Sequence, residues 1–201
     1  MALGRRSPSW RETTFVALDV EATSADPRSA VPLSVGWVPV RAGRVVPAAG
    51  GYTLVRPPSG VRLDEAETVE ALRVHRLLPE EVEAGADAAS VGATLRDVLA
   101  DAVLLAHGAD LERAVLRGWG VPVGRVVDTL AVVRRLDERA GRPRASPRLP
   151  DVARRWALPP LTAHHAHTDA LTTALLLVAL ADDVERERGA CTLRDLELLG
   201  R

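Results

Sequence analysis

FVALDVEAT, residues 15–23, is an apolar stretch that places two acidic residues, Asp19 and Glu21, two positions apart. On a β-strand, residues i and i+2 point to the same face, so these two carboxylates are expected to project side by side. Two carboxylates on a hydrophobic strand are costly to hold together without a partner, and hard divalent cations such as Mg²⁺ take oxygen ligands. The alternative interpretation is an ordinary half-buried strand with polar residues on its solvent-exposed face.

The composition indicates one ordinary globular domain. The chain has 201 residues, of which 47% are hydrophobic and 26% charged, enough for one sizeable core. Its single cysteine, Cys191, excludes an internal disulfide and argues against a thiol-based zinc site. No apolar run resembles a signal peptide or spans a bilayer, so we expect a cytoplasmic protein with no membrane partner. A net charge of −1 argues against a strongly basic nucleic-acid binder, but not against an enzyme that grips nucleotides through metal ions.

The order of apolar runs and turn residues predicts an α/β fold built on a mixed sheet in a single domain. After a disordered lead over residues 1–11, strands are expected at residues 13–20, 33–40 and 44–55, with a hairpin turn between the last two. Strands at residues 102–106 and 123–127 then alternate with helices. The expected helices cover residues 91–99, 110–117, 128–139, 149–156, 168–183 and 193–199. A meander followed by alternating strands and helices is typical of a mixed β-sheet flanked by α-helices.

Three further segments carry acids and histidines at predicted strand-to-helix junctions. They are AHGADLE at residues 106–112, VDTL at residues 127–130 and AHHAHTDA at residues 163–170. The carboxyl ends of strands and the amino ends of helices are where α/β proteins build their sites. Each segment also has a purely structural interpretation, since Asp110 and Thr168 could cap helices and Asp128 could open the next one.

Together these segments resemble the DEDD-type 3′–5′ exonucleases of the histidine branch (DEDDh), which have the ribonuclease H-like fold and include the proofreading epsilon subunit of bacterial DNA polymerase III. DVEAT at residues 19–23 is similar to the first motif, Asp-x-Glu-Thr-Thr-Gly, with Ala22 and Ser24 as departures. Residues 106–112 are similar to the second, His-Asn-Ala-x-Phe-Asp, and residues 164–170 to the third, His-x-Ala-x-x-Asp-Ala. The resemblance covers about residues 13–182 of an exonuclease domain placed at residues 12–201.

The resemblance implies a metal-dependent hydrolase that removes nucleoside monophosphates from the 3′ ends of single-stranded DNA. It implies that the acidic residues hold two divalent ions, Mg²⁺ or Mn²⁺, and that His164 is the general base that deprotonates the attacking water. Two ions about 3.5–4 Å apart can activate the water and support the departing 3′ oxygen. The implied metal ligands, all counted as catalytic, are Asp19, Glu21, Glu112 and Asp169.

Two positions in the motifs leave alternatives open. The aspartate of the second motif falls on Glu112, one methylene longer, and Asp110 is the competing candidate. The family spacing of five residues before Asp169 selects His164, whereas helix geometry favours His165, because residues i and i+4 share a face. We place Glu112 and His164 in the site. His167 is expected at the surface or behind the site.

Substrate contacts are also implied by the resemblance. The backbone of Ala22 and Thr23 would meet the terminal nucleotide, while Ala25 stands where the family often has a bulky wedge residue. Asp128 is expected to have a supporting or structural role. Eight arginines between residues 134 and 155 could follow a phosphate backbone or simply form a solvated surface.

The sequence leaves two other functions open. One is a 3′–5′ exoribonuclease acting on short RNA, because discrimination against the 2′-hydroxyl depends on the shape of the pocket. The other is a non-catalytic module with a degenerate site, which binds nucleic-acid ends or a polymerase partner. The oligomeric state is not indicated by the sequence.

Overall fold

The computed structural model describes residues 7–144 and 146–200. The strands are β1 (Phe15–Ala22), β2 (Pro32–Arg41), β3 (Arg44–Val45), β4 (Gly51–Leu54), β5 (Val103–Ala106) and β6 (Val126–Asp128). The helices are α1 (Ala66–His75), α2 (Pro79–Glu83), α3 (Ala88–Leu99), α4 (Asp110–Gly118), α5 (Thr129–Arg139), α6 (Leu149–Arg155), α7 (Ala166–Arg188) and α8 (Leu193–Leu199), with short 3-10 turns η1 (Trp10–Glu12) and η2 (Pro47–Ala49). Within the described ranges, no helix is both long and apolar enough to cross a membrane.

The strands form one mixed sheet in the order β3-β2-β1-β5-β6, with β4 also paired to β2. β2 is antiparallel to β1, whereas β5 is parallel to β1 and β6 is parallel to β5. β1 is therefore central, and its pairing with β5 ends at Ala17. Its last residues extend past β5 and reach the carboxyl edge of the sheet, where open α/β sheets bind ligands.

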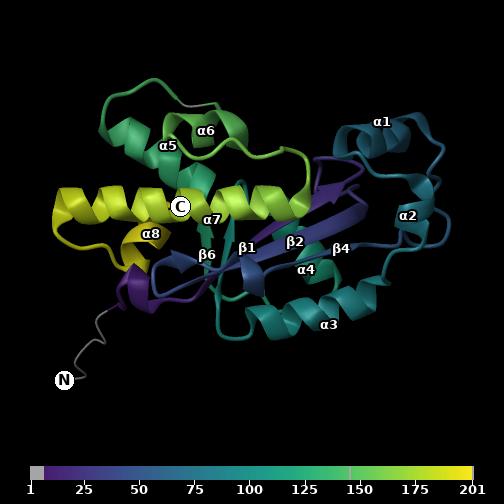
Figure 1. Cartoon of the computed structure of the whole chain (residues 1–201), viewed down its shortest axis with the longest axis horizontal. Coiled ribbons are helices and arrows are strands. Elements are labelled where there is room, and N and C mark those ends of the chain that lie inside the picture. Colours follow the sequence, from purple (N-terminus) through teal and green to yellow (C-terminus); the bar gives the residue numbers. More distant parts are fainter. Residues whose placement is uncertain (1–6, 145, 201) are drawn as a thin grey trace.

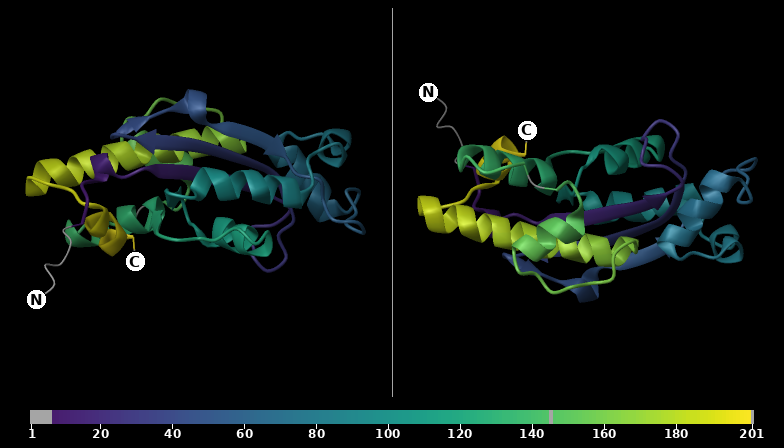
Figure 2. Two further views of the ribbon diagram at one scale, coloured as in Figure 1. Left: turned by 90° about the horizontal axis from the view of Figure 1, so that it is seen from below. Right: turned by 90° about the horizontal axis from the view of Figure 1, so that it is seen from above.

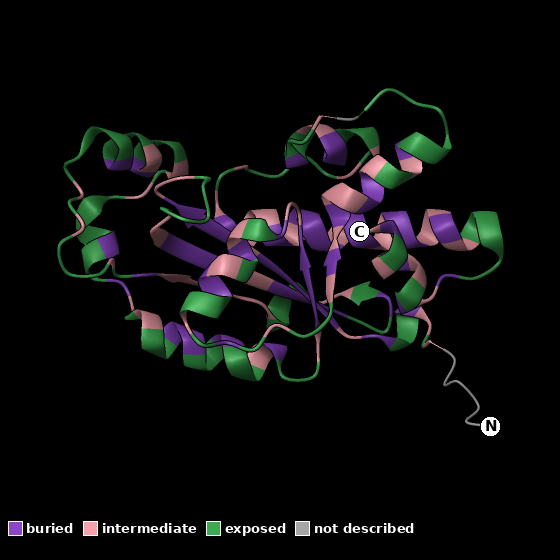
Figure 3. Ribbon diagram, turned by 180° about the vertical axis from the view of Figure 1, so that it is seen from behind, coloured by how far each residue is buried: buried purple, intermediate pink, exposed green. Residues whose placement is uncertain are grey.

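Helices cover both faces of this sheet (Figure 1). α7 packs along one face against β1 and β2, with α5, α6 and α8 beside it. α3 and α4 pack against the opposite face through a second apolar cluster. α1 and α2 lie at one end of the molecule (Figure 2) and enclose a small third cluster around Leu72 and Val82. The strands are mostly buried, whereas α1, α2 and the outer sides of α3 and α6 are largely exposed (Figure 3).

The alternation of side chains along β1 fixes which face carries the acids. Phe15 and Ala17 belong to the apolar cluster beneath α7, whereas Val16 and Leu18 belong to the cluster beneath α3 and α4. Because side chains alternate with period two, Asp19 continues the row of Phe15 and Ala17. The two acids of the opening stretch therefore lie on the α7 face, at the end where β1 leaves the sheet.

Gly36 on β2 allows α7 to approach the sheet closely. It pairs with Asp19, and a Cβ atom at this position would come within 2.2 Å of the His167 backbone nitrogen and 2.4 Å of the Ala166 carbonyl carbon. Ala166, Ala170 and Ala174 on α7 are fully buried. Small side chains on both elements thus set the first turns of α7 directly over the acidic end of β1.

The predicted mixed-sheet architecture agrees with the structure, and three local predictions need correction. The expected disordered lead is wrong for residues 7–11. Ser7 and Pro8 accept hydrogen bonds from the backbone at the start of α8, Ser9 caps η1, and Trp10 is fully buried; residues 1–6 lie outside the described residues. The expected strand at residues 44–55 is two short strands, since Pro47 begins a 3-10 turn between them. The expected strand at residues 123–127 begins only at Val126.

The predicted hairpin turn is present. Arg41 and Arg44 are paired across a two-residue loop, in which Ala42 and Gly43 have φ angles of 50° and 69°. Two residues with positive φ match a type I′ turn, whose twist suits antiparallel strands. Glycine adopts this conformation without strain, whereas the alanine does so at a cost.

Candidate active site

Three carboxylates from two distant segments meet at the carboxyl end of β1. Asp19 and Glu21 come from the strand, and Asp169 comes from the first turn of α7. One oxygen of each lies within 4.8 Å of an oxygen of the others, which is a spacing that could hold a metal ion. The structure therefore brings together three of the four acids that the sequence motifs single out.

Glu112 reaches the same region from the first turn of α4. Its side chain is only 6% exposed, and Oε2 has no hydrogen-bond partner among the described residues. Burial raises the pKa of Glu112 to about 8, with the charges of Asp128 and Glu21 adding to the effect. The competing Asp110 is exposed at the start of α4, where Ala109 is the N-cap. The longer side chain of Glu112 is thus enclosed, while Asp110 lies at the surface.

The carboxylates repel one another strongly. Burial raises the pKa of Asp19 well above its ordinary value, and the negative charges of Glu112, Glu21 and Asp169 raise it further. Burial also raises the pKa of Asp169, against the hydrogen bond that its carboxylate accepts from the backbone of His164. Such a cluster is stabilised either by protons or by cations.

The donor set fits a hard divalent cation. All four candidate ligands offer carboxylate oxygens, which suit Mg²⁺ and Mn²⁺. Two of these oxygens, Glu21 Oε1 and Glu112 Oε2, are buried without a hydrogen-bond partner among the described residues. Buried polar atoms normally have a hydrogen-bond partner, so these two acceptor oxygens are suited to bind a cation.

The three histidines ahead of and within α7 point in different directions. His164 lies before the helix with a φ angle of 63°, and its side chain offers a nitrogen close to Glu21. His165 is the N-cap of α7 and stacks on Tyr52, with ring centroids 4.5 Å apart. His167 lies on the first turn of α7 against Gly50. Of the two histidines that the sequence left as candidates, His164 is the one whose ring lies near Glu21.

His75 is a neighbour of the acids that the sequence motifs did not indicate. It is the last residue of α1, and its Nδ1 lies 2.6 Å from Glu21 Oε2 while its Nε2 lies 3.2 Å from the carbonyl oxygen of Ala22. Burial lowers the pKa of His75, but the hydrogen bond and charge of Glu21 outweigh it, so that the pKa is raised overall. A lone histidine at the end of a polar helix offers no signal in the sequence for this contact.

Asp128 and His107 hydrogen-bond the loops around the site to one another. The carboxylate of Asp128 accepts hydrogen bonds from the backbone of Gly108 and Ala109 ahead of α4 and from Leu130 and Ala131 at the start of α5. It thereby caps α5 and fixes the loop that delivers Glu112. His107 contacts Thr129 Oγ1 at 2.9 Å and the carbonyl oxygen of Pro147 at 3.1 Å.

A cleft of about 500 Å³ opens beside Glu21. The segment after β1 forms one wall, and α1 forms the other; its lining includes Thr23, Ala25, Val74, His75 and Leu111. The backbone N–H of Thr23 already donates to the carbonyl oxygen of Val31, so it is engaged within the protein. The carbonyl oxygen of Ala22 likewise accepts from His75. These two backbone groups are therefore already hydrogen-bonded within the protein.

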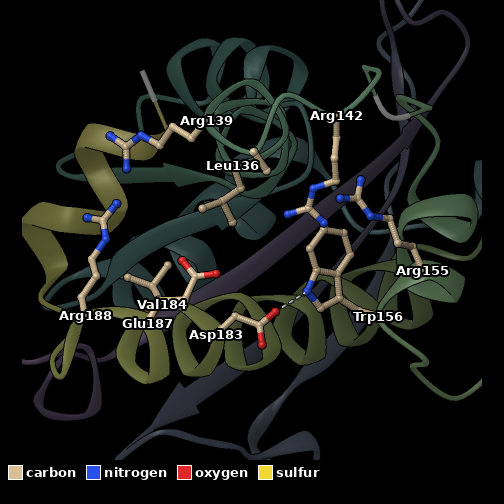
Figure 4. Close-up of a pocket in the computed structure, with 10 residues that line it drawn as sticks. Leu136, Arg139, Arg142, Arg155, Trp156, Asp183, Val184, Glu187 and Arg188 are labelled. Carbon is tan, nitrogen blue, oxygen red and sulfur yellow. Dashed lines mark hydrogen bonds between the residues drawn. The ribbon is translucent and has the colours of Figure 1, made fainter.

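Several arginines of the arginine-rich segment pair with acids of the same region. Arg155 and Arg142 both pair with Asp137, which is 1% exposed. These arginines line a second cavity, of about 500 Å³, between α5, α6 and the end of α7 (Figure 4). There the Trp156 indole donates to Asp183 Oδ2 at 2.9 Å. This cavity includes Val184, which lies 15 residues after Asp169 along α7, or roughly 22 Å from the acids.

Sequence comparison relates most of the chain to an exonuclease family and to PolC-type DNA polymerases. A family model described as an exonuclease, of the RNase T type, matches residues 16–177. Two curated relatives are PolC-type DNA polymerases III from Thermotoga maritima, 27% identical over 198 residues, and Thermotoga petrophila, 26% identical over 201 residues. They cover 94% and 95% of this chain, which spans only 13% of the length of each.

Solved structures share the architecture at low sequence identity. Exonuclease X in complex with 5′ overhanging duplex DNA has a TM-score of 0.67 at 22% identity, covering 92% of this chain and 99% of that one. Exonuclease I of E. coli with a dT13 oligonucleotide has a TM-score of 0.67 at 16% identity, covering 87% and 42%. Cell-death related nuclease 4 has a TM-score of 0.69 at 13% identity, covering 89% and 65%. These likenesses confirm the predicted fold class, and the family match confirms the predicted exonuclease resemblance.

Proposed function

Because the chain belongs to the RNase T-type exonuclease family, we propose that it is a metal-dependent 3′–5′ exonuclease acting on single-stranded DNA. It hydrolyses the terminal phosphodiester and releases nucleoside monophosphates. The observation that carries this proposal is the convergence of Asp19, Glu21 and Asp169 within 4.8 Å at the carboxyl edge of the sheet, with the buried Glu112 beside them. The location in the cytoplasm stays a prediction.

The four carboxylates would hold two divalent cations. When bound, these cations supply charge stabilisation for both the attacking and the leaving oxygen. Asp19 and Glu21 are presented from a rigid central strand, while Glu112 and Asp169 are presented from the first turns of helices packed on opposite faces. This framework pre-organises the ligands, so little reorganisation is needed when the ions bind.

His164 is the residue that accepts the proton of the attacking water. It is exposed, and its backbone is fixed by the hydrogen bond to Asp169, so that its ring can reach the acids while remaining in contact with solvent. Histidine is the side chain that most often acts as a general base. His165 is held away from this role by its stacking on Tyr52.

The cleft beside Glu21 would receive the terminal nucleotide. Its walls contain the small side chains of Ala22 and Ala25 and the apolar side chains of Val74 and Leu111. A flat base can pack against such apolar surface, but no Phe, Tyr or Trp among the described residues lines this cleft. We therefore expect weak discrimination between bases at the 3′ end. Two structures of similar fold, exonuclease X with duplex DNA and exonuclease I with dT13, support a DNA substrate.

The relatives named as PolC-type polymerases support a link to replication, with a polymerase as the partner. The chain matches only 13% of their length, so the polymerase itself is a separate protein or segment in this proposal. The enclosed position of Glu112 argues against a degenerate site, because the longer side chain is buried among the other acids.

Degradation of a 5′-labelled single-stranded DNA oligonucleotide in Mg²⁺ tests the proposal. We expect a ladder that shortens from the 3′ end, and a 3′-labelled copy that loses its label at once as a mononucleotide. Asp19→Asn and EDTA should both abolish the ladder. An RNA of the same sequence runs beside the DNA, and faster loss of the RNA would reassign the substrate. No cleavage of either strand by the folded protein, or full cleavage by Asp19→Asn, would contradict the proposal.

A further inference from the structure

A second set of metal-ligating side chains overlaps the carboxylate cluster. Glu21, His75 and His164 each offer a ligand atom, and these atoms lie within 4.8 Å of one another. They come from three separate places: the end of β1, the end of α1 and the loop before α7. The set contains two imidazoles and one carboxylate, and is therefore chemically different from the all-oxygen set of Asp19, Glu21, Glu112 and Asp169.

Two of the three side chains are already held in place. His75 Nδ1 lies 2.6 Å from Glu21 Oε2, and the two side chains are only 13% and 9% exposed. The contact of His75 Nε2 with the carbonyl oxygen of Ala22 holds the ring beside the carboxylate, and the buried Nδ1 has no aligned hydrogen-bond partner among the described residues. Glu21 Oε1 is buried without a hydrogen-bond partner among the described residues. An acceptor is thus free for a cation at this position.

The third side chain, His164, lies on the solvent-exposed side of this set. The His164 ring lies edge-on to the His75 ring, with centroids 6.2 Å apart. Its backbone is fixed by the bond to Asp169, whereas its side chain is exposed and free to rotate. The site can therefore close around an ion by movement of one exposed side chain, and solvent can supply a fourth ligand.

We propose that Glu21, His75 and His164 form a site for Zn²⁺, distinct from the Mg²⁺ centre although it shares Glu21 with it. Zn²⁺ is bound by imidazole and carboxylate ligands in sets of three protein groups plus water, whereas Mg²⁺ takes oxygen ligands. Bond lengths of about 2.0–2.2 Å in a tetrahedral arrangement place ligand atoms roughly 3.3 Å apart. The contact between His75 and Glu21 opens slightly, and His164 moves inward, to reach this spacing.

Occupation of this site has a consequence for the exonuclease, and this part rests on the function proposed above. A zinc ion here engages Glu21, which the Mg²⁺ centre needs, and also engages the imidazole of His164, which accepts the proton from water. Zinc should therefore inhibit Mg²⁺-dependent hydrolysis at concentrations at which it binds. Because both centres need Glu21, added Mg²⁺ should relieve this inhibition, but only in large excess over zinc, since zinc has two imidazole ligands that Mg²⁺ does not use.

Zinc binding to the full chain, without nucleic acid, tests the site itself. After treatment with EDTA and its removal, the protein is titrated with Zn²⁺ in competition with a chromophoric chelator. His75→Gln and His164→Gln should each weaken binding at least about tenfold, since loss of even an outer partner of a metal ligand costs 10–100-fold in affinity. His165→Gln and His167→Gln are the matched controls and should bind Zn²⁺ as the wild type does. His164 is exposed, so its variant is expected to fold.

Asp19→Asn separates the two candidate centres. It removes a carboxylate of the oxygen-lined set but none of the three zinc ligands, so zinc binding should persist. Co²⁺ in place of Zn²⁺ should give the strong visible absorption of a four-coordinate site in the wild type and in Asp19→Asn, but not in His164→Gln. Wild-type zinc affinity in both His75→Gln and His164→Gln, or loss of zinc binding in Asp19→Asn alone, would overturn the proposal. Because these measurements need no turnover, they stand apart from the outcome of the exonuclease assay.

Discussion

The backbone N–H of His164 donates a hydrogen bond of 2.8 Å to Asp169 Oδ2. This bond joins the loop ahead of α7 to the acid on its first turn, and it turns the loop so that His164 and His165 face different surroundings. The ring of His164 reaches toward Glu21, whereas the ring of His165 stacks on Tyr52. The bond thereby decides which of two adjacent histidines can serve the acids.

His164→Ala should lower kcat for the removal of the terminal nucleotide by about 10²–10⁴-fold, the usual loss when a general base is removed. KM should change much less, because the ring does not line the cleft beside Glu21. His165→Ala, which removes the stacking on Tyr52 and the contact of Nδ1 with Thr168 Oγ1, is the matched control and should lower kcat less than tenfold. Steady-state kinetics on a short single-stranded DNA measure both. The opposite ranking of the two variants would move the general base to His165.

Gly36→Ala should displace the beginning of α7 from the sheet. The added Cβ would stand 2.2 Å from the backbone nitrogen of His167, and backbone atoms cannot yield as a flexible side chain does. We expect a loss of about 1–3 kcal/mol in the free energy of unfolding, the range for overpacked sites. The activity should fall further than stability alone explains, because Asp169 moves with the helix.

Gly124→Ala is the control for that substitution, since nothing lies within 4 Å of a Cβ atom there. Urea denaturation and the exonuclease rate are measured on both variants. An alanine at residue 36 that leaves both quantities unchanged would mean that the close approach of β2 and α7 does not position the site.

Glu112→Gln and Asp110→Asn test which residue completes the acidic site. Glu112 is enclosed and Asp110 is exposed, so the first variant should reduce the Mg²⁺-dependent rate at least a hundredfold and the second less than threefold. Glu112→Asp shortens the ligand by one methylene and reports whether this framework has adapted to glutamate. Loss of activity in Asp110→Asn with retention in Glu112→Gln would move the ligand to Asp110.

The metal-free protein should lose stability as the pH rises. The pKa of Glu112 is about 8 in the folded protein and near its ordinary 4.5 in the unfolded chain. Between these values the unfolded chain has released a proton that Glu112 retains in the folded protein, so Glu112 alone lowers the free energy of unfolding by up to roughly 1.4 kcal/mol per pH unit. Asp19 and Asp169, whose pKa values are also raised, add to this slope. Denaturation in EDTA at pH 5, 6, 7 and 8 measures this slope, and Glu112→Gln should flatten it. A slope that is the same in both proteins would show that Glu112 is not a buried, protonated carboxyl.

The sequence indicated the centre of this site but not its surroundings. Alternation along β1 placed Asp19 and Glu21 on one face, and the junctions after β5 and before α7 were indicated by their acids and histidines. The contact of His75 with Glu21 was not predictable, because it depends on how α1 packs against the end of β1. The burial of Trp10 was missed for a similar reason: its backbone N–H bonds to the carbonyl oxygen of Cys191, at the far end of the chain.

The choice between Glu112 and Asp110 shows the same limit at one helix. Both residues lie in the first turn of α4, and spacing alone could not say which one faces inward. The direction is set by Asp128, whose carboxylate accepts hydrogen bonds from the backbone of Gly108 and Ala109 and so fixes the start of α4. That arrangement joins residues from two junctions, and a linear pattern does not contain it.

Titration of the metal-free protein with Mn²⁺, followed by calorimetry, tests the central claim most directly: that carboxylates from β1, α4 and α7 form one metal centre. The account predicts binding of two ions to the wild type, with release of protons from the acids whose pKa values are raised, and loss of this binding in Asp19→Asn. Undiminished binding of Mn²⁺ by Asp19→Asn, or no binding by the folded wild type, would contradict it.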